Sequence, residues 1–188
     1  PRGKVLDLAR LRPHRASDVK LSVSRDYADI AGSDVIIVTA GVARKPNMSR
    51  EDLLFINVDI IKGVAEQIKT HCPEAFIIVA TNPVDTMAYV FHKVSGFPKQ
   101  QVVGLSGALD TGRFQSFIAE ETGLSVKDIS CMVIGGHGPT MVPLVSTASI
   151  AGIAIPDLLN DAQIEHIVAQ TKEAGTENVP LLGTGTAN

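Results

Sequence analysis

Three short apolar segments, separated by two helical segments, constrain the fold of this chain most strongly. They are residues 34–39, 75–81 and 101–105, and the first two are rich in β-branched side chains. Near-continuous runs of this kind are typical of buried strands in a parallel sheet, and we expect residues 34–39 to form a central strand. Because parallel strands need crossover connections, the intervening helices fit the same scheme. The pattern predicts an α/β domain with a mainly parallel sheet.

The two intervening helices carry boundary signals. Residues 49–52 have the form of a capping box, and the helix that follows is predicted to run to about residue 72. Its apolar stripe contains one polar residue, Asn57, which is either hydrogen-bonded in the core or directed at a ligand. The second helix is predicted to begin at Pro83 with Asn82 as its N-cap. These signals place both helices between the predicted strands.

The chain changes character near Leu105. Before it, residues 18–23 alternate polar and apolar side chains and are predicted to form a half-buried or edge strand. After it, a long helix is followed by consecutive extended segments. The predicted elements there are a helix over 108–122, a buried strand over 129–134, an extended segment over 141–150, a turn at 152–156 and a helix over 161–174. We therefore divide the chain into an α/β domain over residues 1–105 and an α+β domain over residues 106–188.

The composition narrows the class of function. The 188 residues are 45% hydrophobic and 20% charged, as in a globular protein, and the net charge of −3 gives no indication of nucleic-acid binding. Two cysteines, Cys72 and Cys131, make neither a disulfide framework nor a metal-ligand spacing. We find no signal peptide and no apolar run long enough to span a membrane. These features favour the cytosol or a similar reducing compartment, without a membrane or a metal.

Residues 134–140 contain one imidazole, His137, among three glycines, directly after a predicted buried strand. Ligands gather at the ends of strands in α/β sheets, and histidine exchanges protons near neutral pH. Asp110 and Arg113 lie three residues apart and hence on one helix face. An aspartate beside a histidine fixes its tautomer, as in many active sites. The alternatives are a turn with a surface histidine and an ordinary surface ion pair.

Three further residues are candidates for ligand binding. Arg44 and Arg50 bracket a polar loop and a helix start, from where their guanidinium groups could close over an acidic substrate. Asn82 follows a buried strand, at the position where ligands bind in doubly wound sheets. Taken singly, each has a simpler explanation, as a solvated arginine or a plain helix cap.

Four motifs in order resemble those of malate dehydrogenases, in the lactate-dehydrogenase-like branch found mostly in bacteria. They are Thr-Ala-Gly-Val-Ala-Arg-Lys-Pro-Asn-Met-Ser-Arg at residues 39–50, Thr-Asn-Pro-Val-Asp at 81–85, Leu-Asp-Thr-Gly-Arg-Phe at 109–114 and Gly-Gly-His-Gly at 135–138. The resemblance runs over nearly all of the chain. It implies a partial Rossmann-type NAD-binding domain over residues 1–105 and a partial catalytic domain over residues 106–188.

The resemblance implies reversible hydride transfer between malate and NAD, which gives oxaloacetate and NADH. It assigns proton exchange to His137 and the orientation of that histidine to Asp110. Arg113 would bind the carboxylate next to the reacting carbon and Arg44 the distal carboxylate. Arg50 would polarise the carbonyl when the loop closes.

The resemblance also implies a row of cofactor contacts. Asn82 would touch both the substrate and the nicotinamide ribose. The remaining residues expected along NAD are Thr39, Ala40, Gly41, Asn57, Ala80 and Thr81. The expected partners are a small dicarboxylate and further copies of the same chain, commonly as a cytoplasmic homotetramer that serves the tricarboxylic acid cycle.

Three features depart from the family pattern. The sequence contains no G-x-G-x-x-G, because the family places this loop, which cradles the pyrophosphate, before the position that corresponds to Pro1. The family also continues beyond Asn188, so we expect a chain truncated at both ends. Pro139 stands where the family usually has an acid, and it biases Gly138 towards extended conformations.

Two other functions stay open on the sequence. A lactate dehydrogenase shares His137, Asp110, Arg50 and Arg113, but does not normally carry an arginine at position 44. A non-catalytic remnant that keeps the fold and assembles with other subunits would explain Pro139 and the missing glycine-rich loop. The retained charged and acid–base residues favour an enzyme.

Overall fold

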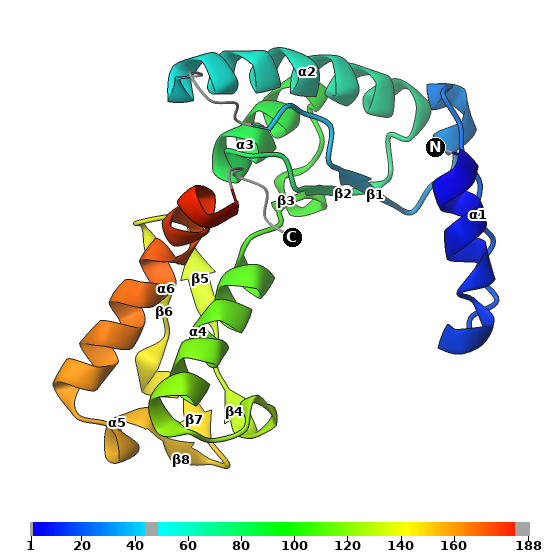
Figure 1. Cartoon of the computed structure of the whole chain (residues 1–188). Coiled ribbons are helices and arrows are strands. Elements are labelled where there is room, and N and C mark those ends of the chain that lie inside the picture. The colour runs from blue at the N-terminus through cyan, green and yellow to red at the C-terminus, as the bar shows by residue number, and fades with distance from the viewer. Residues whose placement is uncertain (1, 44–48, 183–188) are drawn as a thin grey trace.

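The computed structural model describes residues 2–43 and 49–182, except for the side chains of Arg50 and of residues 175–182. Its elements form two units in chain order (Figure 1). The first unit contains α1 (Arg2–Arg10), β1 (Val35–Val38), α2 (Arg50–His71), β2 (Phe76–Val79), α3 (Val84–Ser95) and β3 (Val102–Gly104). The second unit contains α4 (Gly107–Thr122), β4 (Ile129–Ser130), β5 (Val133–Gly135), β6 (Met141–Pro143), β7 (Ser149–Ile150), β8 (Ile153–Ala154), α5 (Ile155–Leu158) and α6 (Asp161–Leu182).

The first unit is built on a parallel sheet with the strand order β1-β2-β3. Val38 is opposite Val79 in the first pair, and Val79 is opposite Gly104 in the second. Helices α2 and α3 pack against each other, and their apolar stripes bury Ile61 and Phe91 completely. The core continues into the central strand β2. The predicted α/β architecture is therefore confirmed.

Two predictions about strands in the first unit are wrong. Within the sheet that the structure describes, β1 pairs only with β2 and lies at the edge instead of the predicted central position, and Ile37 is 61% exposed. Residues 18–23 form no strand, although their apolar side chains alternate. A strand needs a neighbour to complete its ladder of hydrogen bonds, and no described strand lies beside this segment. Its alternating side chains Val19, Leu21 and Val23 are accordingly exposed.

The two long helices of the first unit begin in different ways. The capping box of α2 is confirmed, since Ser49 and Asp52 exchange side-chain and backbone hydrogen bonds. The predicted start of α3 is wrong by one residue. Its N-cap is Pro83, which makes no side-chain cap, and Asn82 lies outside the helix. The backbone carbonyl of Asn82 accepts a hydrogen bond from the Asn57 amide at 2.8 Å instead, which fixes Asn82 in the preceding loop.

The second unit is α+β, as predicted. Its strands form an antiparallel sheet of order β4-β7-β8 and a separate antiparallel pair of β5 and β6. Helices α4 and α6 pack side by side. They share a second core with the strands, in which Phe114, Ile118 and Ile167 are fully buried. The two units therefore have separate apolar cores.

Several element boundaries in the second unit differ from the predictions. The apolar run 129–134 is two strands, because Ile129 pairs with β7 whereas Val133 pairs with β6. A 3-10 turn at Val145–Thr147 interrupts the extended segment 141–150. The predicted turn at 152–156 holds β8 and the start of α5. Helix α6 continues beyond Ala174 to Leu182.

The units are joined directly, since only Leu105 and Ser106 separate β3 from α4. Figure 1 shows α2 and α3 on one side of this junction and α4 and α6 on the other, while α1 projects away from the rest of the first unit. No residue of α1 is buried. In the described part of the chain, no helix is both long enough and apolar enough to cross a membrane.

Candidate active site

The structure brings three of the predicted site residues together. The Nδ1 atom of His137 lies 2.8 Å from Oδ2 of Asp110, and the guanidinium of Arg113 donates to Oδ1 of Asp110 at 3.2 Å. Asp110 stands in the first turn of α4 and is only 1% exposed. The alternative of an ordinary surface ion pair is therefore wrong for Asp110. One buried carboxylate holds an imidazole and a guanidinium at the same time.

The geometry around Asp110 determines which nitrogen of His137 can react. An ionised carboxylate only accepts hydrogen bonds, so Nδ1 carries the proton that lies between His137 and Asp110. This leaves Nε2 as the nitrogen that can take up and return a proton. The His137 side chain retains 23% of its exposure, and that of Arg113 retains 17%. Both side chains can therefore contact a small ligand while Asp110 remains covered.

The segment that carries His137 depends on its glycines. We call residues 136–140, between β5 and β6, the histidine loop. A Cβ atom on Gly136 would lie 2.6 Å from the Thr140 hydroxyl. Gly138 has φ +139°, a value that residues with a side chain rarely adopt. It is therefore not in the usual extended conformation with negative φ, towards which the following Pro139 would bias it. The loop with Pro139 nevertheless places His137 against Asp110.

The expected cofactor residues lie in two loops at the carboxyl edge of the parallel sheet. Thr39, Ala40 and Gly41 follow β1, whereas Ala80, Thr81 and Asn82 follow β2. The hydroxyl of Thr81 donates to the carbonyl of Ala40 at 2.7 Å, which joins the two loops. Asn82 is exposed, as a ligand contact requires. Dinucleotides bind at this edge in doubly wound sheets, so the position of these residues fits NAD.

The side chain of Asn57, on helix α2, forms hydrogen bonds with the backbone of both loops. Its Oδ1 atom accepts from the Val42 amide at 2.8 Å, and its Nδ2 atom donates to the carbonyls of Asn82 at 2.8 Å and Val42 at 3.3 Å. The residue is 1% exposed. Its interruption of the apolar stripe of α2 is therefore explained by hydrogen bonds to the backbone, whereas a contact with the cofactor stays a prediction.

Two predicted substrate residues fall on parts that are not described. Arg44 lies outside the described residues altogether. Arg50 is the first residue of α2, but its side chain is not described. Their roles in binding the distal carboxylate and polarising the carbonyl stay predictions.

Asp85 was not among the predicted site residues, yet it contacts the histidine loop. Its Oδ2 atom accepts a hydrogen bond from the backbone N–H of His137 at 2.9 Å. The two residues are 52 positions apart in the sequence and belong to different units. The one available signal was the motif at residues 81–85, which contains Asp85. An acid in the first turn of a helix is already explained by the helix dipole, and so it did not stand out.

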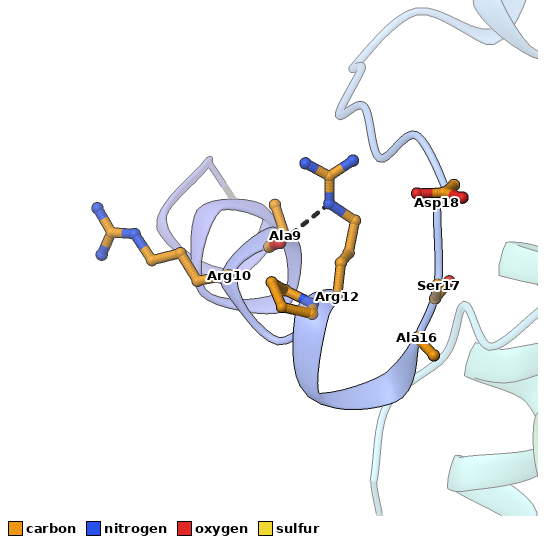
Figure 2. Close-up of a pocket in the computed structure, with 7 residues that line it drawn as sticks. Ala9, Arg10, Arg12, Ala16, Ser17 and Asp18 are labelled. Atoms are coloured by element: carbon orange, nitrogen blue, oxygen red, sulfur yellow. Dashed lines mark hydrogen bonds between the residues drawn. The ribbon is translucent and has the colours of Figure 1, made fainter.

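A surface pocket lies elsewhere, at the end of α1. Arg10, Arg12 and Asp18 are among the residues that line it, and Figure 2 shows the Arg12 side chain, which donates to the Ala9 carbonyl at 3.0 Å. None of the predicted site residues lines it. Among the described residues, no group of three or more His, Cys, Asp or Glu side chains is placed to hold a metal ion.

A parallel sheet that carries the expected cofactor residues at its carboxyl edge is typical of dinucleotide-binding folds, and the contact of His137 with the buried Asp110 adds an acid–base pair. Comparison with known families agrees. The family described as lactate/malate dehydrogenase, NAD binding domain, matches residues 1–104, and its alpha/beta C-terminal domain matches residues 107–187. The chain therefore belongs to the lactate/malate dehydrogenase family, as the four motifs indicated.

Similar proteins include malate dehydrogenases from several bacteria. The chain is 50% identical to that of Staphylococcus saprophyticus over 99% of its residues, and 48% identical to that of Roseobacter denitrificans over all of them. It spans 60% of the length of both relatives.

Solved structures give the same result. The malate dehydrogenase of Picrophilus torridus in its apo form is 46% identical, with a TM-score of 0.90 over 98% of this chain and 59% of its own. The lactate dehydrogenase of Cryptosporidium parvum, complexed with lactic acid and nicotinamide adenine dinucleotide, is 44% identical, with a TM-score of 0.88 over 98% of this chain and 60% of its own.

Proposed function

We propose that this protein catalyses the reversible, NAD-dependent oxidation of malate to oxaloacetate. The observation that carries the proposal is the contact of His137 with the buried carboxylate of Asp110, next to the edge where the family binds NAD. Proteins of this family with high identity are named malate dehydrogenases. The proposal also assigns residues 1–105 to the NAD-binding domain and residues 106–188 to the catalytic domain, in a cytoplasmic homo-oligomer.

Each described site residue has a distinct task in this proposal. Bound NAD supplies the hydride acceptor, along the loops that follow β1 and β2. His137 takes the hydroxyl proton of malate on Nε2 and returns it in the reverse direction. Asp110 keeps the imidazole in the reactive tautomer and stabilises its protonated form. Arg113, held by Asp110, pairs with the carboxylate next to the reacting carbon.

The choice of substrate rests on a residue outside the described part. Malate and lactate share one carboxylate and differ at the far end, where malate has a second carboxylate. Arg44 would pair with that second carboxylate, whereas a pyruvate complex would bury its guanidinium without a partner. Similarity to known proteins does not by itself decide between a malate and a lactate dehydrogenase. The malate and lactate dehydrogenases of Cryptosporidium parvum are 42% and 44% identical to this chain, with the same TM-score of 0.88.

The first experiment tests the substrate. We expect kcat/KM of the natural protein to be on the order of 10²–10⁴-fold higher for oxaloacetate than for pyruvate, since an unpaired buried charge costs roughly 3–5 kcal/mol. Arg44→Gln should lose activity with oxaloacetate and gain some with pyruvate. Steady-state oxidation of NADH measures both. A ratio that Arg44→Gln leaves unchanged would mean that Arg44 is only a solvated loop residue and that selectivity arises elsewhere, whereas a wild type that prefers pyruvate would favour a lactate dehydrogenase.

The second experiment tests whether the protein is an enzyme or a non-catalytic remnant. His137→Asn should lower kcat by roughly 10²–10⁴-fold, because a positioned acid–base group is lost. Binding of NADH, measured by nicotinamide fluorescence, should stay nearly unchanged, since the dinucleotide is held by the other unit. A wild-type protein that binds NADH and turns over neither substrate would support the remnant.

A further inference from the structure

We propose that Asp85 is a positioning residue for His137, which holds the backbone of the histidine loop from the other unit. The inference rests on the proposed acid–base function of His137. It assigns to the first unit a direct part in aligning an acid–base group that the second unit carries.

The contact that carries this inference is a charge-assisted hydrogen bond. Asp85 stands in the first turn of α3, and its Oδ2 atom accepts from the His137 N–H at 2.9 Å. Bonds of this kind are about twice as strong as those between neutral groups. His137 is thus held at two points, through its ring by Asp110 of the second unit and through its main chain by Asp85 of the first.

The neighbouring residue shows that the loop lies close against this carboxylate. A Cβ atom on Gly136 would stand 3.1 Å from Oδ2 of Asp85, in addition to its clash with Thr140. Few Cβ atoms approach an oxygen so closely, so a side chain at position 136 would push the loop away from Asp85. Glycine at this position permits the hydrogen bond of His137.

The hydrogen bond between Asp85 and the backbone of His137 matters because proton transfer is sensitive to distance. A general base must lie within about 2.6–3.2 Å of the proton it takes, and a shift of about 1 Å can reduce the rate roughly 10²-fold. Without Asp85, the ring of His137 would still be bound to Asp110, but its main chain would lose its attachment to the first unit. Turnover should then suffer more than binding, because neither the cofactor loops nor Arg113 contact Asp85 through a described hydrogen bond.

The test compares three variants of the natural protein. Asp85→Ala should lower kcat with oxaloacetate about 10- to 100-fold and change KM for NADH less than about twofold. Asp85→Asn keeps an oxygen that can accept the same bond, so it should retain most of kcat. Asp161→Ala is the matched control, because Asp161 is also an exposed acid in the first turn of a helix and its side chain makes no hydrogen bond to the described residues. Its kcat should equal that of the wild type.

A second measurement does not depend on activity. Amide hydrogen exchange of residues 135–140 should become faster in Asp85→Ala and stay unchanged in Asp161→Ala. An unchanged kcat in Asp85→Ala, an equal loss in Asp85→Asn, or unchanged exchange in the histidine loop would overturn the inference. If the wild type reduces neither oxaloacetate nor pyruvate, the proposed function fails. The exchange measurement still tests whether Asp85 holds the backbone of the histidine loop.

Discussion

Asn57 is a single buried amide that joins two loops of the candidate cofactor site. Replacing it with alanine removes the partners of the Val42 amide and the Asn82 carbonyl. We expect Asn57→Ala to lower the free energy of unfolding by about 1–3 kcal/mol, the cost of leaving such groups unsatisfied. Denaturation in urea measures this change. Asp59→Ala on the same helix, where the side chain is 79% exposed, should stay within about 0.5 kcal/mol of the wild type, and an equal loss there would contradict the explanation.

Cys131 offers a test of burial at a single thiol. Desolvation raises the pKa of this group above its usual value, so less of it is thiolate at a given pH. We expect iodoacetamide to modify Cys131 more slowly than free cysteine at pH 8, with a rate that still rises as the pH increases further. Mass spectrometry of the modified protein gives the rate. A reaction as fast as that of free cysteine would show that the thiol is more accessible than the structure indicates.

Local spacing was enough to predict part of the site. Asp110 and Arg113 share a helix face whenever that segment is helical, and His137 stood out among glycines. The contact between Asp110 and His137 could be expected only from the resemblance, since it joins two elements. Asp85 was missed for the same reason, because its partner lies 52 residues away and a helix start already accounts for an acid there.

At the scale of the element, the start of α2 gives a prediction about pH. The Ser49 hydroxyl and then the Ser49 backbone N–H donate to Asp52, and these bonds lower the pKa of Asp52 from 3.8. A lowered pKa in the folded state means that the stabilisation is present above pH 3.8 and is lost as the pH falls through the lower value. We expect Asp52→Asn to reduce Tm at pH 7, and the reduction to shrink as the pH falls below about 4.

Glu51→Gln is the control for this prediction. Glu51 is an exposed acid in the same first turn, but it is not part of the capping box. Its replacement should change Tm less at pH 7 than Asp52→Asn does. A pH-independent effect of Asp52→Asn would show that the cap does not depend on the charge of Asp52.

Element types were easier to predict than element ends and neighbours. Long helices and the parallel strands followed from periodicity and from β-branched runs. Residues 129–134 show only an apolar run, and nothing in that run reveals that its two halves pair with different strands. Residues 18–23 have the alternation of a strand, but a strand also requires a neighbour, which is a property of the surroundings and not of the segment.

At the scale of the whole molecule, the two separate cores predict two regions of independent stability. Ile61 and Ile118 are both fully buried, one in each core. Replacing either with valine should cost roughly 0.5–1.5 kcal/mol. We expect Ile118→Val to speed amide exchange mainly in residues 107–174, and Ile61→Val mainly in residues 35–104. Equal acceleration of both regions in both variants would show that the chain opens as one cooperative unit and would contradict the proposed division into domains.

The short junction between the units has a consequence for how a substrate could reach the site. Each residue spans at most about 3.6 Å, so Leu105 and Ser106 keep the start of α4, and with it Asp110, near the end of β3. The bond of Asp85 to the backbone of His137 is a second attachment of the site to the same unit. A hinge that swings the units apart would have to break this second attachment. Entry of the proposed substrate by such a rotation would therefore cost this hydrogen bond, whereas the exposed part of the His137 side chain can be reached without breaking it.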